Sequence, residues 1–202
     1  MTSFLDIAFT PCVLEVQDRK GSLGVYPSDE SAVVTPHQLD KEETLMIESA
    51  DSFYMATVGE TGWPYVQHRG GDPGFVKAIG PTQIGWVERS GNRQYLGAGN
   101  VSTCGRVALI FMDYPNRVRL KLYGNATYHA EAPEALVHQV GAEELRADGA
   151  FTIDVVATAW NCPKYITPRF TEQQVNTLVS PLVERIAELE SQVQHLTAAQ
   201  TQ

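Results

Sequence analysis

Three consecutive pieces decide the fold: YVQHRGGDPGFVKAI at residues 65–79, IGWVERSGNRQYLGAGNV at 84–101 and RVALIFMDYPNRVRLKLYG at 106–124. Each piece combines an apolar, β-rich run with glycine and arginine in the adjoining connections. Glycine lets a backbone approach a ligand closely, and arginine supplies the charge that a phosphate requires. The stretch therefore predicts strands whose connections carry a binding site for a buried aromatic ligand.

Strand patterns continue on both sides of this stretch. The run FYMATV at 53–58 and the run 63–68 flank a glycine-bearing turn at 59–62, which predicts a hairpin. Further strands are expected at 75–79, 83–88, 107–113, 118–129 and 151–159, with a short helix at 96–103. In the run 118–129, Val118, Leu120 and Leu122 alternate with mostly charged residues, which predicts one core face and one charged face. Because most of these strands follow one another without a helix between them, the sheet should be antiparallel.

Helical patterns bracket the strands. Thr35-Pro36-His37-Gln38 has the form of a capping box and predicts a helix over 36–50, and a second helix is expected over 133–147. Thr171 begins another capping box, and Ser180-Pro181 is expected to restart that helix. The pattern predicts a mainly β, α+β fold: a small antiparallel barrel of six or seven strands with flanking helices and a C-terminal helix.

The expected organisation has three parts. Residues 1–34 form an N-terminal arm without clean periodicity, residues 35–170 form the barrel, and residues 171–202 form a helical tail. Apolar residues of the tail are spaced alternately four and three residues apart, as in a heptad seam. These residues are Val175, Val179, Leu182, Ile186, Leu189, Val193 and Leu196. The seam packs either on its own barrel or on a helix of another chain.

Composition narrows the classes of partner and location. The 202 residues are 43% hydrophobic and 19% charged, as in ordinary globular proteins, with a net charge of −9. An acidic chain is a poor partner for nucleic acid or anionic membranes. Cys12, Cys104 and Cys162 lie far apart and form no CxxC pair, which favours a reducing cytoplasm. Neither an export signal nor a membrane anchor is expected.

The connection 68–74 is the first candidate site. It contains Gly70, Gly71 and Gly74, and Arg69 within it can fork onto a phosphate, with Lys77 on the next strand as a second cation. The alternative is an ordinary wide turn with a surface arginine.

Two further segments of the sequence are candidate parts of the binding site. Asn92, Arg93, Gln94 and Tyr95 stand immediately before the helix 96–103, where an anion is favoured, and Asn100 lies one turn into it. The alternative there is a capped connector. In the third piece, Trp160 and Asn161 can stack on and hydrogen-bond to a planar heteroaromatic, although a core tryptophan is the commoner case.

The sequence gives little support for a metal site or for the common catalytic motifs. The histidines at 37, 68, 129, 138 and 195 share no metal-ligand spacing, and the chain lacks GxSxG, HExxH and paired-carboxylate signatures. No catalytic general base and no metal site are therefore predicted.

Long motifs do resemble a known family. The chain carries FxxIAFTPxV at 4–13, DSFYMATV at 51–58, GxPYVQHRGGxPGFVK at 62–77, GNRQYxxxGN at 91–100 and WNCPxxITPRFT at 160–171. These motifs resemble the pyridoxamine 5′-phosphate oxidase-like, FMN-binding split-barrel proteins, in the bacterial branch with HRGGxPGF and WNCP motifs. The resemblance runs from about residue 4 to about residue 190.

The resemblance implies a six-stranded antiparallel split β-barrel and a homodimer with FMN in a cleft at the interface. The residues implied in FMN contacts are Arg69, Gly70, Lys77, Asn92, Arg93, Gln94, Tyr95, Asn100, Trp160 and Asn161. Two positions depart from the family pattern, Asp72 in the glycine-rich connection and Lys164 after WNCP. The arginine-rich C-terminal motif of authentic pyridoxamine phosphate oxidases is missing, so vitamin B6 oxidation is not expected.

The functional expectation is an FMN-dependent oxidoreductase that acts on a small organic acceptor or oxygen. The alternative is a non-catalytic carrier or sensor of flavin or haem, in which His68 is the first haem ligand to test. A third reading places function in the tail, where the heptads recruit another helix.

Overall fold

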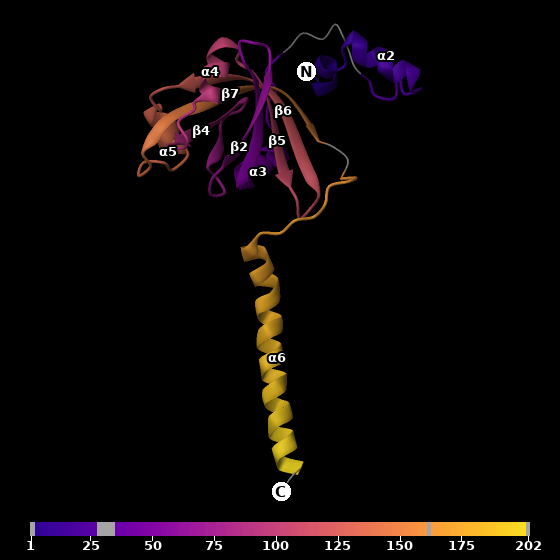
Figure 1. Ribbon diagram of the computed structural model, residues 1–202, viewed down its shortest axis with the longest axis vertical. Helices are drawn as coiled ribbons and strands as arrows, with labels where there is room; N and C mark the ends of the chain where they lie inside the picture. The colour runs from indigo at the N-terminus through magenta and orange to yellow at the C-terminus, as the bar shows by residue number, and fades with distance from the viewer. Residues whose placement is uncertain (1–2, 28–34, 161–162, 201–202) are drawn as a thin grey trace.

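A computed structural model describes residues 3–27, 35–160 and 163–200 of the chain, with side chains described up to residue 196. The helices are α1 Phe4–Ala8, α2 Pro11–Arg19, α3 Lys41–Ser49, α4 Leu96–Thr103, α5 Glu134–Gln139 and α6 Glu172–Gln200. The strands are β1 Ser52–Val58, β2 Pro64–Gly70, β3 Val76–Gly80, β4 Gln83–Arg89, β5 Arg106–Asp113, β6 Val118–His129 and β7 Ala147–Trp160. Figure 1 shows one curved sheet with short helices around it and α6 projecting away.

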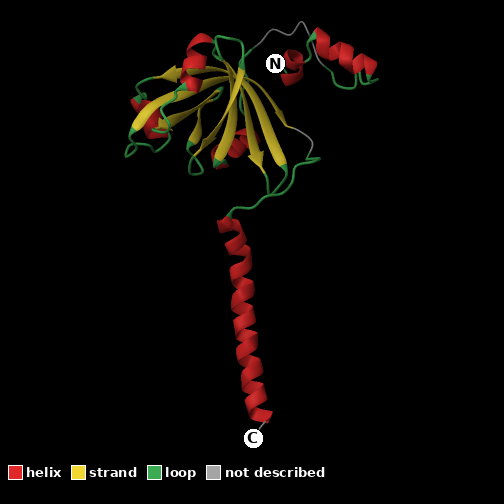
Figure 2. Cartoon of the chain, viewed as in Figure 1, coloured by secondary structure: helices red, strands yellow, loops and turns green. Residues whose placement is uncertain are grey.

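The strands form one antiparallel sheet in the order β2-β1-β5-β6-β7-β4-β3. Figure 2 shows the strands of this sheet in yellow. The sheet is not closed, since β2 and β3 remain its edges. The predicted antiparallel split barrel is confirmed, with seven strands among the described residues where six were implied. The β1–β2 hairpin is also confirmed, and it pairs Ser52 with Gly70 and Val58 with Pro64.

The core lies inside the curve of the sheet. Alternation in β6 buries Leu120 and Leu122 completely, as predicted. Four aromatic side chains meet there, and Phe53 contacts Trp86 edge-on at 5.1 Å between ring centroids and Phe111 at 4.9 Å. Trp86 in turn stacks on Phe151 at 5.1 Å. Two members of this cluster, Trp86 and Phe151, line the pocket described below.

The predicted start of the helix at 36–50 is wrong. α3 begins at Lys41, and its capping box is Asp40 with Glu43 rather than Thr35 with Gln38. The preceding residues are extended because the His37 N–H donates to Val155 O at 2.9 Å. Glu43 is only 3% exposed, and it also accepts a hydrogen bond from Thr158 Oγ1 on β7. The hydrogen bond to the sheet therefore outweighs the capping pattern of Thr35 and Gln38.

The region 133–160 also differs from expectation. α5 spans 134–139 instead of 133–147, and Gly141, at φ +65°, follows its end. β7 begins at Ala147 rather than 151, because Ala147 and Ala150 pair with Arg89 and Val87 on β4. Tertiary pairing therefore converts the predicted helical end into strand.

The N-terminal segment contains two short helices that the sequence pattern did not indicate. Ser3 and Asp6 form a capping box for α1. Phe4 is 8% exposed and stacks on Tyr123 of β6 at 4.2 Å, with Lys121 Nζ 4.4 Å from its ring centroid. This part of the arm packs on the outer face of the chain's own barrel.

The C-terminal helix α6 is continuous. Thr171 forms the predicted capping box, since Gln174 N–H donates to Thr171 Oγ1 at 3.2 Å. The predicted restart at Ser180-Pro181 is wrong, because Pro181 lies within the helix. Of the helices described, none combines the length and the apolar character needed to cross a membrane.

Candidate functional site

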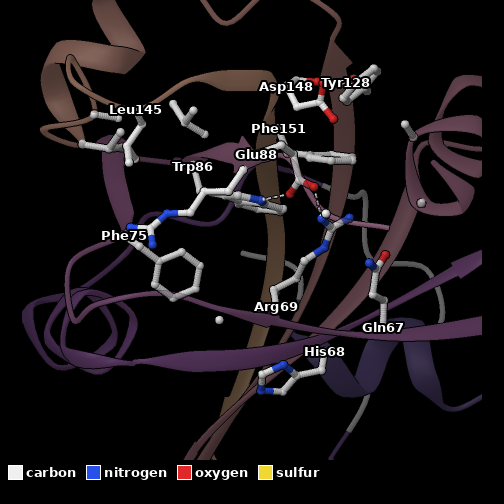
Figure 3. A pocket seen from close by; sticks show the side chains of 18 of the residues that line it. Gln67, His68, Arg69, Phe75, Trp86, Glu88, Tyr128, Leu145, Asp148 and Phe151 are labelled. Atoms are coloured by element: carbon white, nitrogen blue, oxygen red, sulfur yellow. Dashed lines mark hydrogen bonds and ion pairs between the residues drawn. The ribbon is translucent and has the colours of Figure 1, made fainter. Parts of the chain in front are cut away.

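A pocket of about 400 Å³ opens where the two ends of the sheet approach each other. Its walls come from β2 and the connection after it, from β4, from residues 91–98, and from the segment that joins α5 to β7. Figure 3 shows Trp86 and Phe151 at the back of the pocket and Leu145 on its outer wall. The volume lies within the range of ligand sites for small molecules and cofactors.

Arg69 is the central cation of the pocket. Strand alternation turns Gln67 and Arg69 inward and His68 to the opposite side of β2 (Figure 3). The guanidinium is paired with Glu88 of β4 and lies 4.9 Å from the centroid of the Phe151 ring. Because β2 is one edge of the sheet and β4 belongs to its other end, this ion pair joins the two ends across the barrel.

Both carboxylate oxygens of Glu88 accept hydrogen bonds. One carboxylate oxygen accepts from Arg69, and the other accepts from Trp86 Nε1 at 2.7 Å. Arg69 is 8% exposed, and its Nε finds no hydrogen-bond partner among the described residues. The guanidinium beside the pocket therefore has one N–H that its ion pair with Glu88 does not satisfy.

Helix α4 begins against this guanidinium. A Cβ on Gly97 would lie 2.9 Å from Arg69 Nη2, so the close approach requires glycine. Tyr95 is the N-cap residue, and its side chain makes no capping hydrogen bond to the helix. The first residues of α4, which line the pocket, therefore begin the helix without a side-chain cap, and the backbone N–H groups of a helix start favour an anion.

The connection before α4 is held in an uncommon conformation. Arg93 and Tyr95 have φ values of +60° and +52°, in the left-handed region where non-glycine residues are rare. The Gln94 N–H donates to Asn92 Oδ1 at 3.1 Å, which fixes the turn. Tyr95 is tied to the far wall, since its hydroxyl donates to Asp148 Oδ2 at 2.8 Å. Such backbone strain costs on the order of 1 kcal/mol per residue and is concentrated at binding sites.

The far wall is partly polar and partly apolar. Tyr128 donates its hydroxyl proton to the backbone oxygen of Asp148 at 2.9 Å, and burial, followed by the charge of Asp148, raises the pKa of Tyr128. Val140, Ala142 and Leu145 contribute apolar surface from the segment after α5. The pocket thus has a polar, partly cationic side and an apolar side.

Charges on the lining residues balance. Among the described lining residues, the cations are Arg69, Arg89 and Arg93, and the anions are Asp72, Glu88 and Asp148. Asp72 is 93% exposed and lies 3.5 Å from Arg89, so its carboxylate already has a cation beside it. Arg93 is the lining arginine that no described ion pair neutralises. The positive end of the pocket is therefore at Arg93 and the start of α4.

The predicted site residues divide into two groups. Arg69, Gly70, Asn92, Arg93, Gln94 and Tyr95 line the pocket together. Lys77, Asn100 and Trp160 do not line it. Lys77 Nζ lies 3.6 Å from Glu48, and Asn100 Nδ2 donates to Thr57 Oγ1 at 2.9 Å. Asn161 lies outside the described residues.

Trp160 ends β7 opposite Leu120 and is 39% exposed. Its indole is therefore available to a surface other than the pocket of its own chain.

Several lining residues were not predicted. Trp86, Glu88, Tyr128, Asp148 and Phe151 all lie on β4, β6 or β7. A signal was present in β4, where Trp86 and Glu88 are two residues apart and so share one face. His68, the candidate haem ligand, is also among the lining residues, but its imidazole meets Tyr54 edge-on at 5.4 Å on the outer side of β2. No group of three or more potential metal ligands occurs in the part of the chain that the structure describes.

The open antiparallel sheet with a pocket between its ends defines the class of split-barrel proteins. Residues 39–158 match the family described as pyridoxamine 5′-phosphate oxidase. The match covers more than half of the chain, so the chain belongs to this family, as its motifs predict. No curated protein sequence matches the chain.

Several solved structures are similar to the chain at low sequence identity. HupZ from Group A Streptococcus is 14% identical, with 65% of this chain and 99% of that chain covered and a TM-score of 0.50. An FMN-binding protein from Syntrophomonas wolfei is 11% identical, with 59% and 82% covered and a TM-score of 0.45. HutZ, the heme storage protein from Vibrio cholerae, is 14% identical, with 59% and 91% covered and a TM-score of 0.42. These likenesses concern the fold alone, and the ligand has to be argued from the pocket.

Proposed function

We propose that the pocket binds FMN and that the chain is an FMN-dependent oxidoreductase. The observation that carries the proposal is that α4 begins without a side-chain cap beside the buried Arg69 guanidinium. Gly97 is the residue of α4 that lies against this guanidinium. A phosphate monoester suits this place, because it accepts hydrogen bonds from backbone N–H groups and from a guanidinium at once.

The remaining surfaces of the pocket fit the other parts of FMN. Arg93 is available as a second cation for the phosphate, since Glu88 already neutralises Arg69. Asn92 and Gln94 offer amides to the ribityl hydroxyls or to the polar edge of the ring. The apolar side at Val140, Ala142 and Leu145 suits the benzenoid end of the ring system.

When bound, FMN supplies reversible transfer of two electrons between a donor and a small organic acceptor or oxygen. The residues of the chain would bind and orient it. Arg69, Arg93 and α4 hold the anionic end, while the apolar wall excludes water from the other end. None of these roles requires a general base from the protein.

Replacing Arg93 with alanine is expected to weaken FMN binding by about 1–3 kcal/mol, the contribution of one charge-assisted hydrogen bond. Fluorescence titration of the refolded apoprotein with FMN measures the change. Arg106→Ala is the matched control, since Arg106 is exposed at the start of β5 and does not line the pocket. Equal affinity in the wild type and both variants would contradict the phosphate assignment.

The same preparation separates the candidate functions. A yellow protein whose photoreduced flavin is reoxidised by oxygen or an organic acceptor supports the oxidoreductase. A flavin that no acceptor reoxidises would assign the pocket to a carrier or sensor. A Soret band on haem titration, without FMN uptake, would overturn the proposal. Mass measurement of the released cofactor distinguishes FMN from a deazaflavin.

We also propose a homodimer in which a second copy covers the outer face of β1 and β2. Register places Tyr54, Val58 and Val66 on this face, and Trp63 follows in the adjoining turn. Their exposed fractions are 38%, 38%, 61% and 78%, which is unusual for large apolar side chains that adjoin one another. The exposed Trp160 would then be free to approach the pocket of the other copy.

Replacing Val66 with aspartate is expected to lower FMN affinity at least tenfold if the pocket is completed by a partner, because a charge in the centre of an apolar interface is costly. The measurement is again FMN titration. Leu45→Asp is the control, since Leu45 is 69% exposed on α3, away from this face. A Val66→Asp protein that keeps wild-type affinity would show that the site is not shared.

A cytoplasmic location is part of the proposal. Cys12 and Cys104 are free thiols, which suits a reducing compartment.

A further inference from the structure

Helix α6 presents a continuous apolar seam to solvent. Its 29 residues span about 43 Å at 1.5 Å per residue and project away from the barrel (Figure 1). The seam residues are Val175, Val179, Leu182, Ile186, Leu189, Val193 and Leu196, and their exposed fractions lie between 43% and 65%. An amphipathic helix of this length is stable in water only if its apolar stripe is covered.

The residue types along the seam indicate what covers it. From Val179 onward, the first apolar position of each heptad, position a, is β-branched: Val179, Ile186 and Val193. The second, position d, is leucine in each case: Leu182, Leu189 and Leu196. β-Branched residues at a with leucine at d favour two parallel strands over trimers and tetramers.

Charges beside the seam select the same arrangement. Arg185 occupies position g and Glu190 occupies position e of the next heptad. In a parallel, in-register pair, position g of one helix lies beside position e of the following heptad in the other helix. Arg185 of each copy would therefore meet Glu190 of the other copy, twice by symmetry. In an antiparallel pair, g faces g and e faces e, so this pairing is lost.

We propose that α6 forms a parallel, in-register, two-stranded coiled coil with α6 of a second copy of this chain. The proposal is independent of the flavin and of the interface on the outer face of β1 and β2. A parallel pair has a two-fold axis along its length, so it is compatible with a barrel dimer that shares this axis.

Other occupants fit the helix less well. Between residues 172 and 196, α6 has four glutamates and one arginine, a charge that anionic lipid surfaces repel. Pro181 falls at position c, on the side away from the seam, so it does not interrupt the contact. Arg185 pairs with Glu188 of its own helix at 2.8 Å, but both side chains are more than half exposed and the contact is exchangeable.

Disulfide trapping tests the geometry in the full-length chain. Leu182→Cys is made in a background in which Cys12, Cys104 and Cys162 are replaced by serine, with Glu184→Cys as the control on the outer face of the same turn. Facing d positions of a parallel pair come within disulfide reach, whereas in an antiparallel pair that aligns the whole seam two copies of residue 182 lie about 10 Å apart along the axis. Under mild oxidation, Leu182→Cys is expected to form covalent dimers at least fivefold faster than Glu184→Cys.

Charge reversal tests the pairing of Arg185 with Glu190. Arg185→Glu in the Leu182→Cys background is expected to slow crosslinking several-fold, and adding Glu190→Arg is expected to restore it. Equal crosslinking of Leu182→Cys and Glu184→Cys, or no rescue by the double reversal, would overturn the proposal. Crosslinked trimers in place of dimers would also overturn it.

Mass in solution separates the helix from the barrel interface. Leu182→Asp removes the seam and Val66→Asp removes the proposed barrel interface. Each single variant is expected to keep twice the 22.2 kDa chain mass at micromolar concentration, and the double variant is expected to be monomeric. A Val66→Asp protein that is already monomeric would show that α6 does not pair, whatever the outcome for the flavin.

Discussion

Replacing Glu88 with alanine is expected to lower the free energy of unfolding by about 3 kcal/mol, at the low end of the cost of breaking a buried ion pair. The variant leaves the Arg69 guanidinium, which is 8% exposed, without its carboxylate, and it leaves Trp86 Nε1 without its acceptor. The low end applies because Glu88 itself keeps 21% of its side chain exposed. Urea denaturation followed by tryptophan fluorescence measures the change.

The matched control removes both charges. Arg69→Met with Glu88→Gln removes both charges and keeps an amide oxygen as the acceptor for Trp86 Nε1, and its stability is expected to lie within about 1 kcal/mol of the wild type. The same double variant should lose FMN affinity, because it removes the proposed phosphate ligand while leaving the barrel folded. A Glu88→Ala protein as stable as the wild type would show that the guanidinium reaches water without the carboxylate.

Replacing Gly124 with alanine is expected to cost about 3 kcal/mol of unfolding free energy. Gly124 lies in the middle of β6, where the register with β7 shifts. A Cβ there would overlap Ile153 Cγ2 and would lie 2.9 Å from the backbone oxygen of Asp154. Ile153 is fully buried, so neither neighbour can move aside without disturbing the core.

A second glycine provides the control for this measurement. Gly99 lies inside α4, and a Cβ built on it meets no atom within 4 Å. Gly99→Ala is therefore expected to stabilise the protein by about 0.5–1 kcal/mol, the helix propensity of alanine over glycine. Destabilisation of equal size in both variants would contradict the assignment of the Gly124 effect to close packing, because alanine at Gly99 meets no neighbouring atom.

Strands were predictable from sequence because their signals are local. Alternation in β6 and the glycine turn between β1 and β2 each act within a few residues, and both predictions are confirmed. The helix α4 has its predicted bounds of 96–103. In contrast, the start of α3 and the start of β7 depend on hydrogen bonds to distant strands, such as the bond from His37 to Val155, and local propensity cannot reveal them.

The pocket was predictable in part for the same reason. Arg69 and residues 92–95 were marked by glycine and by a helix start, which are local features. Glu88 and Phe151 belong to the site only because the two ends of the sheet approach each other. Their contacts with Arg69 join residues separated by 19 and by more than 80 positions. Lys77 and Asn100 carry suitable chemistry, but in this chain Glu48 and Thr57 engage them.

The contact between Arg69 and Glu88 couples the formation of the pocket to the folding of the whole sheet. Its two walls belong to opposite ends of one open barrel, so the pocket exists only while both ends are docked. A ligand seated between β2, α4 and β7 therefore binds the native state and not the unfolded chain, and its binding energy adds to global stability. The melting temperature of the intact protein thus reports occupancy, which makes thermal shift a direct screen for cofactors and substrates of this site.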